Sequence, residues 1–294
     1  MDNKPGRNYL TFVVYGNNPT YYQGAYFGIL SFLANWVGDE SSRPNIVVLT
    51  EDSDWFSGLP IQVFTITPEQ KNDWSMGGDY HFRIKNRGLR YICDQVSLNA
   101  NDKLLFLDAD TYFDKPTNIF FDLINSQQSV MYCSEVNINK LPENNEYAVI
   151  RNKKIPLSDN KIYCVNENSI MWASAIIGIM GNHIDSLDFA DELIIALRNI
   201  GCNAHTLEQF TLSEALAEAC SIVAGKPWLN HYSTSGRKDW AKQVLSDFFD
   251  NYSDCLFEQQ IDRARSISFK RPLFEIIRGH IYKKRKKIQK LFKK

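Results

Sequence analysis

The sequence predicts an α/β fold in which helices flank a mostly parallel sheet. One observation is a set of short, continuously apolar runs rich in β-branched and aromatic residues, as in strands buried on both faces. The other is that apolar residues recur at helical spacing between these runs. Strand and helix alternate from residue 11 to residue 107, which favours parallel strands joined by crossover helices. With 294 residues, 44% apolar and 23% charged, the composition excludes a disordered chain or a disulfide-stapled miniature.

The elements of the first half follow one another clearly. A strand at residues 11–15 ends at a loop containing Gly16 and Pro19, and a helix over 21–36 follows. Further strands are expected at 45–50, 61–66 and 103–107, with a helix at 83–98. The second half is less regular: strands are expected at 130–133 and 175–180, a short strand or loop at 228–232, and helices at 185–200, 207–219, 238–252 and 273–292. Residues 1–265 are interpreted as one domain and 266–294 as a tail.

The charge is unevenly distributed. The formal net charge is −1, yet residues 283–294 hold eight basic residues and no acid, so the remaining chain carries −9. Apolar residues recur at helical spacing through this end of the chain, which predicts a basic amphipathic helix lying on an anionic membrane surface. A solvated charge run and nucleic-acid binding are the alternatives. We expect no nucleic-acid partner, because no aromatic platform is interleaved with the charges.

The compartment is predicted from cysteines and apolar segments. No two of the six cysteines have a short metal-type spacing, which favours reduced thiols. The first ten residues lack the apolar core of a signal peptide, and the longest apolar run, 170–181, is too short to span a bilayer. We therefore expect a cytoplasmic protein, peripheral on the inner face of the membrane.

The strand at 103–107 runs directly into Asp108, Ala109 and Asp110. In extended chain, residues i and i+2 point the same way, so both carboxylates can face one site at the end of the sheet where α/β folds bind ligands. Two hard oxygen ligands suit Mg²⁺ or Mn²⁺, which keep open positions for a diphosphate. The alternatives are a turn-capping Asp and a phosphatase of the haloacid-dehalogenase type. That phosphatase pattern ends the first strand and has Thr or Val where Tyr112 stands.

Residues 104–123, LLFLDADTYFDKPTNIFFDL, resemble glycosyltransferase family 8, which includes glycogenin and bacterial lipopolysaccharide galactosyltransferases. The resemblance implies the GT-A fold, a Rossmann-like and mostly parallel sheet flanked by helices. It also implies a UDP-sugar donor and an Mn²⁺ or Mg²⁺ ion held by Asp108 and Asp110, with Ala109 beside the donor.

Two earlier segments resemble the same family. Residues 11–33 match its opening strand, nucleotide loop and helix, which implies donor contacts at Tyr15 and Gly16 and base stacking by Tyr21 or Tyr22. Residues 81–87 match a basic segment, so Arg83 and Lys85 are expected to offset the diphosphate charge.

Later segments supply the remaining implied roles. Residues 228–240 resemble a segment in which His231 would be the third metal ligand, Gly236 would allow close backbone approach and Lys238 would meet the diphosphate. The loop is longer than in the family, so Arg237 is an alternative to Lys238. Glu208 and Gln209 resemble an Asp-Gln pair near the reactive sugar carbon, which makes them the implied catalytic residues. Residues 171–175 resemble an Asn-Ser-Gly segment, with alanines replacing the Asn and the Gly.

The resemblance implies transfer of a hexose from a nucleotide diphosphate sugar to a glycan or glycolipid hydroxyl, with retention, in polysaccharide or lipopolysaccharide biosynthesis. An inverting enzyme would need a carboxylate base, for which Glu135, Asp185 and Glu208 are available. Two further functions are compatible with the acidic pair, namely the phosphatase and a catalytically silent protein that binds a nucleotide sugar.

Overall fold

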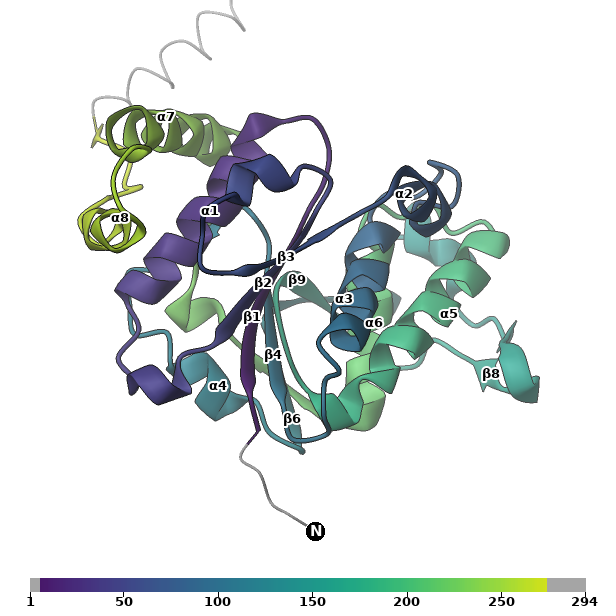
Figure 1. Ribbon diagram of the computed structural model, residues 1–294. Coiled ribbons are helices and arrows are strands. Elements are labelled where there is room, and N and C mark those ends of the chain that lie inside the picture. The colour runs from purple at the N-terminus through teal and green to yellow at the C-terminus, as the bar shows by residue number, and fades with distance from the viewer. Residues whose placement is uncertain (1–5, 274–294) are drawn as a thin grey trace, which may run out of the picture.

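The computed structural model describes residues 6–273 and contains a central seven-stranded sheet flanked by helices (Figure 1). The strand order is β10-β6-β9-β4-β1-β2-β3. Strand β9 runs antiparallel to both of its neighbours, and the other pairs are parallel. This confirms the predicted α/β class and is compatible with a Rossmann-like fold. The strands of the sheet are β1 (Asn8–Val14), β2 (Asn45–Thr50), β3 (Gln62–Thr65), β4 (Lys103–Leu107), β6 (Gln128–Asn137), β9 (Ile170–Met180) and β10 (Ser221–Ala224).

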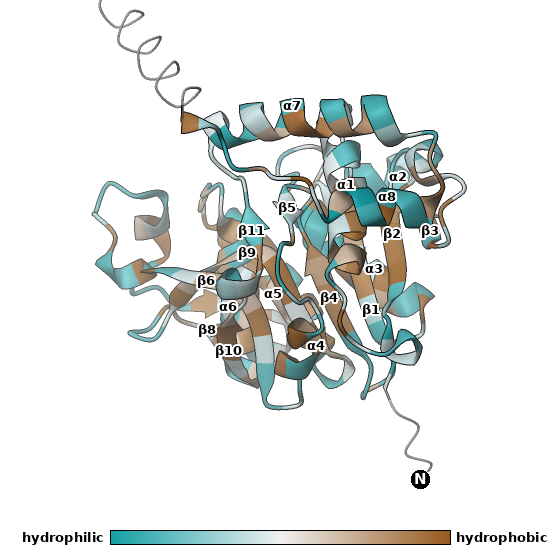
Figure 2. Cartoon of the chain, turned by 90° about the vertical axis from the view of Figure 1, so that its left-hand side faces the viewer, coloured by the Kyte–Doolittle hydropathy of each residue, from teal (hydrophilic) through white to brown (hydrophobic). Residues whose placement is uncertain are grey.

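Two layers of helices bury the sheet between them (Figure 1). Residues of β1 alternate between the layers: Leu10 and Phe12 pack on the side of α1, while Tyr9 and Val13 pack on the side of α3. The first layer consists of α1 (Pro19–Ala34), α4 (Ile119–Leu123), α7 (Ser235–Tyr252) and α8 (Phe257–Ala264). The second consists of α3 (Arg83–Gln95), α5 (Asp185–Asn199) and α6 (Leu207–Ala219), with α2 (Pro68–Trp74) beside it. Figure 2 shows the strands as the apolar interior of this sandwich.

Several element boundaries differ from those expected. Helix α1 begins at Pro19, where the Asn18 side chain accepts a hydrogen bond from the Thr20 N–H and Pro occupies the first turn. Helix α7 begins at Ser235 instead of 238, so Lys238 lies in its first turn. Strands β6 and β9 are longer than predicted because their pairing continues past two register irregularities.

Two small antiparallel sheets of two strands each are separate from the central sheet. One joins β7 (Ile155–Pro156) to β8 (Ile162–Tyr163). The other joins β5 (Thr111–Tyr112) to β11 (Asn230–His231), with His231 opposite Thr111. This second pair brings a late segment of the chain to the loop that follows β4.

The C-terminal part has two aspects. Phe269 is 9% exposed and packs into the core on the α1 side, so the described start of the predicted tail lies against the main body. The basic run 283–294 and most of the predicted helix 273–292 lie outside the described residues. Among the helices within residues 6–273, none is long and apolar enough to cross a membrane.

Candidate active site

The acidic loop follows the central strand β4. Asp108 N–H donates to the Ala175 carbonyl of β9 at 3.0 Å, so the first carboxylate emerges between β1 and β9 at the carboxyl edge of the sheet. The loop also lies tightly against α1, since a Cβ placed on Gly24 would lie 2.1 Å from the Ala109 oxygen. Only glycine allows this approach. The side chains of Asp108 and Asp110 are 30% and 23% exposed, so both can reach a ligand.

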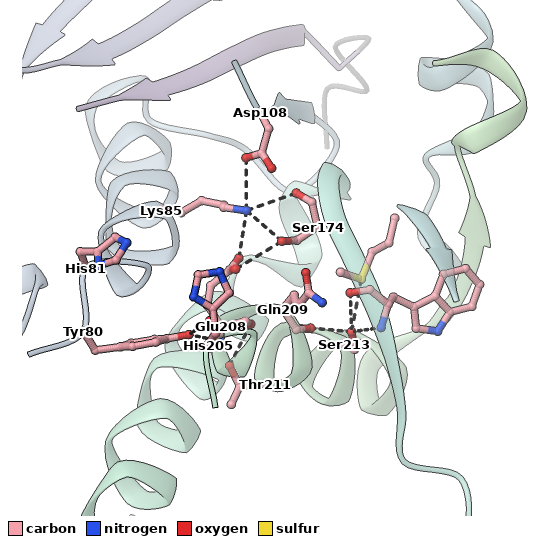
Figure 3. A network of polar contacts seen from close by, with 12 residues as sticks. Tyr80, His81, Lys85, Asp108, Ser174, His205, Glu208, Gln209, Thr211 and Ser213 are labelled. Carbon is pink, nitrogen blue, oxygen red and sulfur yellow. Dashed lines mark hydrogen bonds and ion pairs between the residues drawn. The ribbon is translucent and has the colours of Figure 1, made fainter. Parts of the chain in front are cut away.

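Lys85 connects Asp108 to a second, buried carboxylate (Figure 3). Its Nζ lies 3.2 Å from Asp108 Oδ1 and 3.4 Å from Glu208 Oε1, and it donates to Ser174 Oγ at 2.8 Å. Ser174 Oγ donates in turn to Glu208 Oε2 at 3.2 Å. We call Lys85, Asp108, Ser174 and Glu208 the lysine cluster. Helix α3, strand β9 and helix α6 each bring one member to the end of β4.

The lysine cluster has perturbed acidities. Burial raises the pKa of Glu208 and of Asp108, and the positive charge of Lys85 opposes both shifts. Burial alone would lower the pKa of Lys85, but the charges of Asp108 and Glu208 raise it above its ordinary value. Lys85 therefore stays cationic in this buried position.

The first turn of α6 holds Glu208 in place. Its backbone N–H donates to the Tyr80 hydroxyl oxygen at 2.8 Å, and that hydroxyl donates to the His205 carbonyl at 3.1 Å. The next residue, Gln209, points its Nε2 to Glu135 Oε2 at 2.7 Å. Glu135 is exposed and lies on β6, which runs parallel to β4 because both are antiparallel to β9. Gln209 and Glu135 thus present polar groups to solvent on the side of the sheet that holds the acidic loop.

Two groups from the late segment converge on Asp110. His231 Nε2 lies 3.1 Å from Oδ1, and Lys238 Nζ lies 3.1 Å from Oδ2. Burial opposes ionisation of Asp110, but the hydrogen bond from His231 and the charges of His231 and Lys238 lower its pKa to about 2. Pairing of β11 with β5 places His231, and the early start of α7 places Lys238.

The expected nucleotide loop lies at the end of β1. Gly16 has a φ of +91°, a left-handed conformation that favours glycine, and its N–H donates to the Glu51 carboxylate. The Tyr15 hydroxyl donates to the His81 carbonyl at 3.2 Å. Tyr22 is buried and its ring stacks on that of Trp55, whereas Tyr21 is 47% exposed. Of the two tyrosines expected to stack on a base, Tyr21 has the accessible ring.

Two predicted residues lie apart from this site. The Arg83 guanidinium forms a two-point ion pair with Asp191, at 2.6 and 2.8 Å, and also donates to the Asp73 carbonyl. Arg83 thus joins α3 to α5 through these contacts, and its guanidinium does not lie beside the acidic loop where a diphosphate contact was expected. Asp185 begins α5 just beyond the end of β9, where Met180 pairs with Lys103 at the start of β4. It therefore lies at the opposite edge of the sheet from Asp108.

Sequence reasoning missed three polar contributors, Ser174, Tyr80 and the Gln209–Glu135 contact. The pattern marks the segment containing Ser174 but gives its hydroxyl no role. A signal was present, because Ser174 is a polar residue in the middle of a buried strand. Nothing in the local pattern marks Tyr80, whose partners come from a segment 125 residues later.

The expected metal triad can be tested against these contacts. Among residues 6–273, no group of three His, Cys, Asp or Glu side chains is arranged to hold a metal ion. Asp110 and His231 lie together, while Asp108 turns to Lys85. The two partly exposed carboxylates are nevertheless the hard oxygen ligands that Mn²⁺ and Mg²⁺ accept.

Comparison of the chain with protein-family models found no matching family, and comparison with curated proteins found no significant match. The contacts at the end of β4 therefore carry the functional argument, together with the sequence pattern.

Proposed function

We propose that the protein is a metal-dependent glycosyltransferase of the GT-A type. It transfers a hexose from a nucleotide diphosphate sugar, a UDP-sugar, to a hydroxyl of a glycan or glycolipid. The observation that carries this proposal is the convergence of His231 and Lys238 on Asp110, at the end of the central strand, with Lys85 on Asp108. A diphosphate and a divalent cation need these alternating charges within one site.

We assign the donor contacts from the positions of the predicted residues around the ends of β1 and β4. Tyr21 offers an exposed ring for the base beside Tyr15 and Gly16, at the end of β1 next to β4. Lys238 and Lys85 supply positive charge to the phosphates at the Ala109 loop. Gly236, one turn of helix before Trp240, leaves the start of α7 uncrowded, since the nearest atom to a Cβ there is 3.7 Å away.

Asp108, Asp110 and His231 would hold the metal ion. When bound, the ion stabilises the charge that develops on the leaving diphosphate. Lys85 and Lys238 add to that stabilisation through their positive charges, which are preorganised by the carboxylates beside them.

The carboxylates near the sugar divide into two kinds. Glu208 is 4% exposed and bound to Lys85 and Ser174, which suits it to position Lys85. Gln209 and the exposed Glu135 face solvent beside it, where they can contact the sugar or the acceptor. We propose retention of configuration. Were the enzyme inverting, Glu135 would be the base, because Asp185 lies at the other edge of the sheet and Glu208 is already paired.

The test is a screen of UDP-, GDP- and ADP-hexoses for Mn²⁺-dependent hydrolysis, read as release of the nucleoside diphosphate. Asp110→Asn is expected to lower the rate at least a hundredfold, while the control Asp262→Asn, exposed on α8, leaves it unchanged. Phosphate release from a simple phosphate ester would instead favour the phosphatase. Mn²⁺-dependent stabilisation by UDP without turnover would favour a silent binding protein. If the protein neither turns over any of these substrates nor is stabilised by UDP, the transferase, the phosphatase and the silent binding protein are all refuted.

A further inference from the structure

A cavity adjoins the candidate active site at His231. It is a cavity of about 630 Å³ that His231 borders, but neither Asp108, Asp110 nor Lys238 lines it. Its walls come from β5 and the loop after it, from β6, from residues 226–232, from the start of α7 and from residues 269–271. The cavity therefore adjoins the proposed donor contacts: it shares His231 with them, and its Tyr232 hydroxyl donates to the Ala109 carbonyl at 3.1 Å.

The cavity is strongly basic. Four cationic side chains line it, Lys226, Arg237, Lys270 and Arg271, against the single carboxylate of Asp114. The Asp114 carboxylate accepts a hydrogen bond from Asn230 Nδ2 at 2.8 Å. Within residues 6–273, none of the ion pairs involves any of the four cations. Four positive charges against one carboxylate, none of them ion-paired within the described residues, attract an anion to this concave surface.

Two buried donors add to this charge. Within the described part of the chain, Trp240 Nε1 and Arg271 Nε are shielded from solvent and have no hydrogen-bond partner. Buried N–H groups are nearly always paired in native proteins, so two such donors on one cavity indicate a missing acceptor. The Arg271 guanidinium also lies beside Gly236, where a Cβ would be 3.7 Å from Nη1.

The packing fixes these groups in position. The Phe269 ring stacks on Tyr112 at 4.3 Å and on Tyr232 at 5.5 Å, which anchors the segment that carries Lys270 and Arg271. On the facing wall, Lys226 Nζ lies over the Tyr132 ring at 5.9 Å, and Tyr132 meets His231 edge-on at 5.2 Å. Basic groups thus lie beside aromatic rings, and a sugar ring or an apolar chain next to a phosphate can pack on those rings.

We propose that this cavity binds the acceptor, and that the acceptor carries a phosphate group held by Lys226, Arg237, Lys270 and Arg271. The inference rests on the proposed function, because only a transferase has an acceptor. Of the two candidates for the donor diphosphate, Lys238 contacts Asp110 while Arg237 lines the cavity. With Lys85 and Lys238 proposed to serve the donor phosphates, the four cations of the cavity are available to a second anion. Bordering His231, the cavity holds its ligand next to the site where the donor would react.

The test is isothermal titration of the full-length protein, saturated with UDP and Mn²⁺, with glucose 1-phosphate. Methyl glucoside is the neutral comparison, and geranyl diphosphate represents a lipid-linked phosphate. The variant is Lys226→Gln/Arg271→Gln, and the charge-matched control is Lys153→Gln/Lys154→Gln, two exposed lysines outside the cavity.

We expect the cavity variant to weaken phosphate binding at least tenfold, the control to stay within twofold of wild type, and methyl glucoside to bind at least tenfold more weakly than glucose 1-phosphate. The tighter of the two phosphate ligands distinguishes a soluble from a lipid-linked acceptor. Equal affinity in wild type and cavity variant, or equal affinity for the neutral sugar, would overturn the inference.

Two controls keep the outcomes separable. Unchanged UDP affinity in the cavity variant shows that it is folded, and the single variant Lys226→Gln, at an exposed position, serves if the double variant is unstable. If the wild type neither binds UDP nor turns over a UDP-sugar, but binds phosphate in a Lys226-dependent way, the proposed function is refuted and the anion site remains. UDP turnover without that phosphate binding would refute the cavity alone.

Discussion

Replacing Lys85 with Met removes the positive charge of the lysine cluster but keeps an unbranched side chain only one atom shorter. The Lys85 side chain is 11% exposed and faces carboxylates at 3.2 and 3.4 Å. Each attraction is worth about 5 kcal/mol at an effective dielectric constant of about 20, before the desolvation of the ammonium group is subtracted. Removing one partner of a buried ion pair typically costs about 3–5 kcal/mol, because the other charge remains buried. We expect Lys85→Met to lower the free energy of unfolding by about 3 kcal/mol, since Asp108 is partly exposed.

A double-mutant cycle separates this effect from simple loss of packing. Glu208→Gln removes the other buried charge and leaves Lys85 paired with Asp108. In the combined variant no buried Glu208 carboxylate is left without a cation. We therefore expect the double variant to lose about 1–2 kcal/mol less free energy of unfolding than the sum of the losses in the two single variants. Urea denaturation followed by circular dichroism measures each value, with Lys242→Met, exposed on α7, as the control. Strict additivity, or a Lys85→Met cost below about 0.5 kcal/mol, would show that the Lys85 charge does not stabilise the buried Glu208 carboxylate.

Three further outcomes are expected. Arg83→Met should lower the free energy of unfolding by about 3 kcal/mol, because the ion pair with Asp191 is lost. The UDP affinity, measured by titration, should stay unchanged. Weakened UDP binding at unchanged stability would contradict this prediction. Gly24→Ala should displace the Ala109 loop and lower donor hydrolysis at least tenfold, whereas wild-type rates would contradict the close approach. Burial raises the pKa of Glu214, which lies on α6, so the folded state binds its proton more tightly than the unfolded state does. The resulting stabilisation of the fold is fully present below the pKa of about 4.3 that Glu has in the unfolded chain, and it is lost as pH rises through the higher pKa of the folded state. Denaturation of Glu214→Gln between pH 4 and pH 7 should therefore show a gain over wild type that grows with pH, and a constant difference would contradict the shift.

The sequence was sufficient for the framework of the first half. Continuous apolar runs gave β2 and β4 with their observed bounds, and the end of β4 placed Asp108 and Asp110 at the carboxyl edge. Such strands are identified by local pattern, because burial on both faces leaves no room for polar residues. The position of Asp108 and Asp110 at the carboxyl edge of the sheet therefore followed from the strand pattern alone.

Contacts between distant segments could not be read from local pattern. Arg83 and Asp191 are 108 residues apart, and nothing in the basic segment around Arg83 distinguishes an ion pair with α5 from a ligand contact. The two-residue strand β11 is too short to have a periodicity, yet its pairing with β5 decides that His231 meets Asp110. Family resemblance, not residue pattern, pointed to His231 and Lys238. The role of Ser174 depends on the register of β9 against β4, which only the structure gives.

We propose that Asp110 and His231, together with Asp108, hold a divalent cation that binds the donor diphosphate. Electron paramagnetic resonance of Mn²⁺, titrated into the protein with and without UDP, measures this directly. We expect one bound Mn²⁺ whose affinity rises with UDP and falls at least tenfold in both Asp110→Asn and His231→Ala. Unchanged Mn²⁺ binding in these variants, or UDP binding equally tight without any metal, would contradict it.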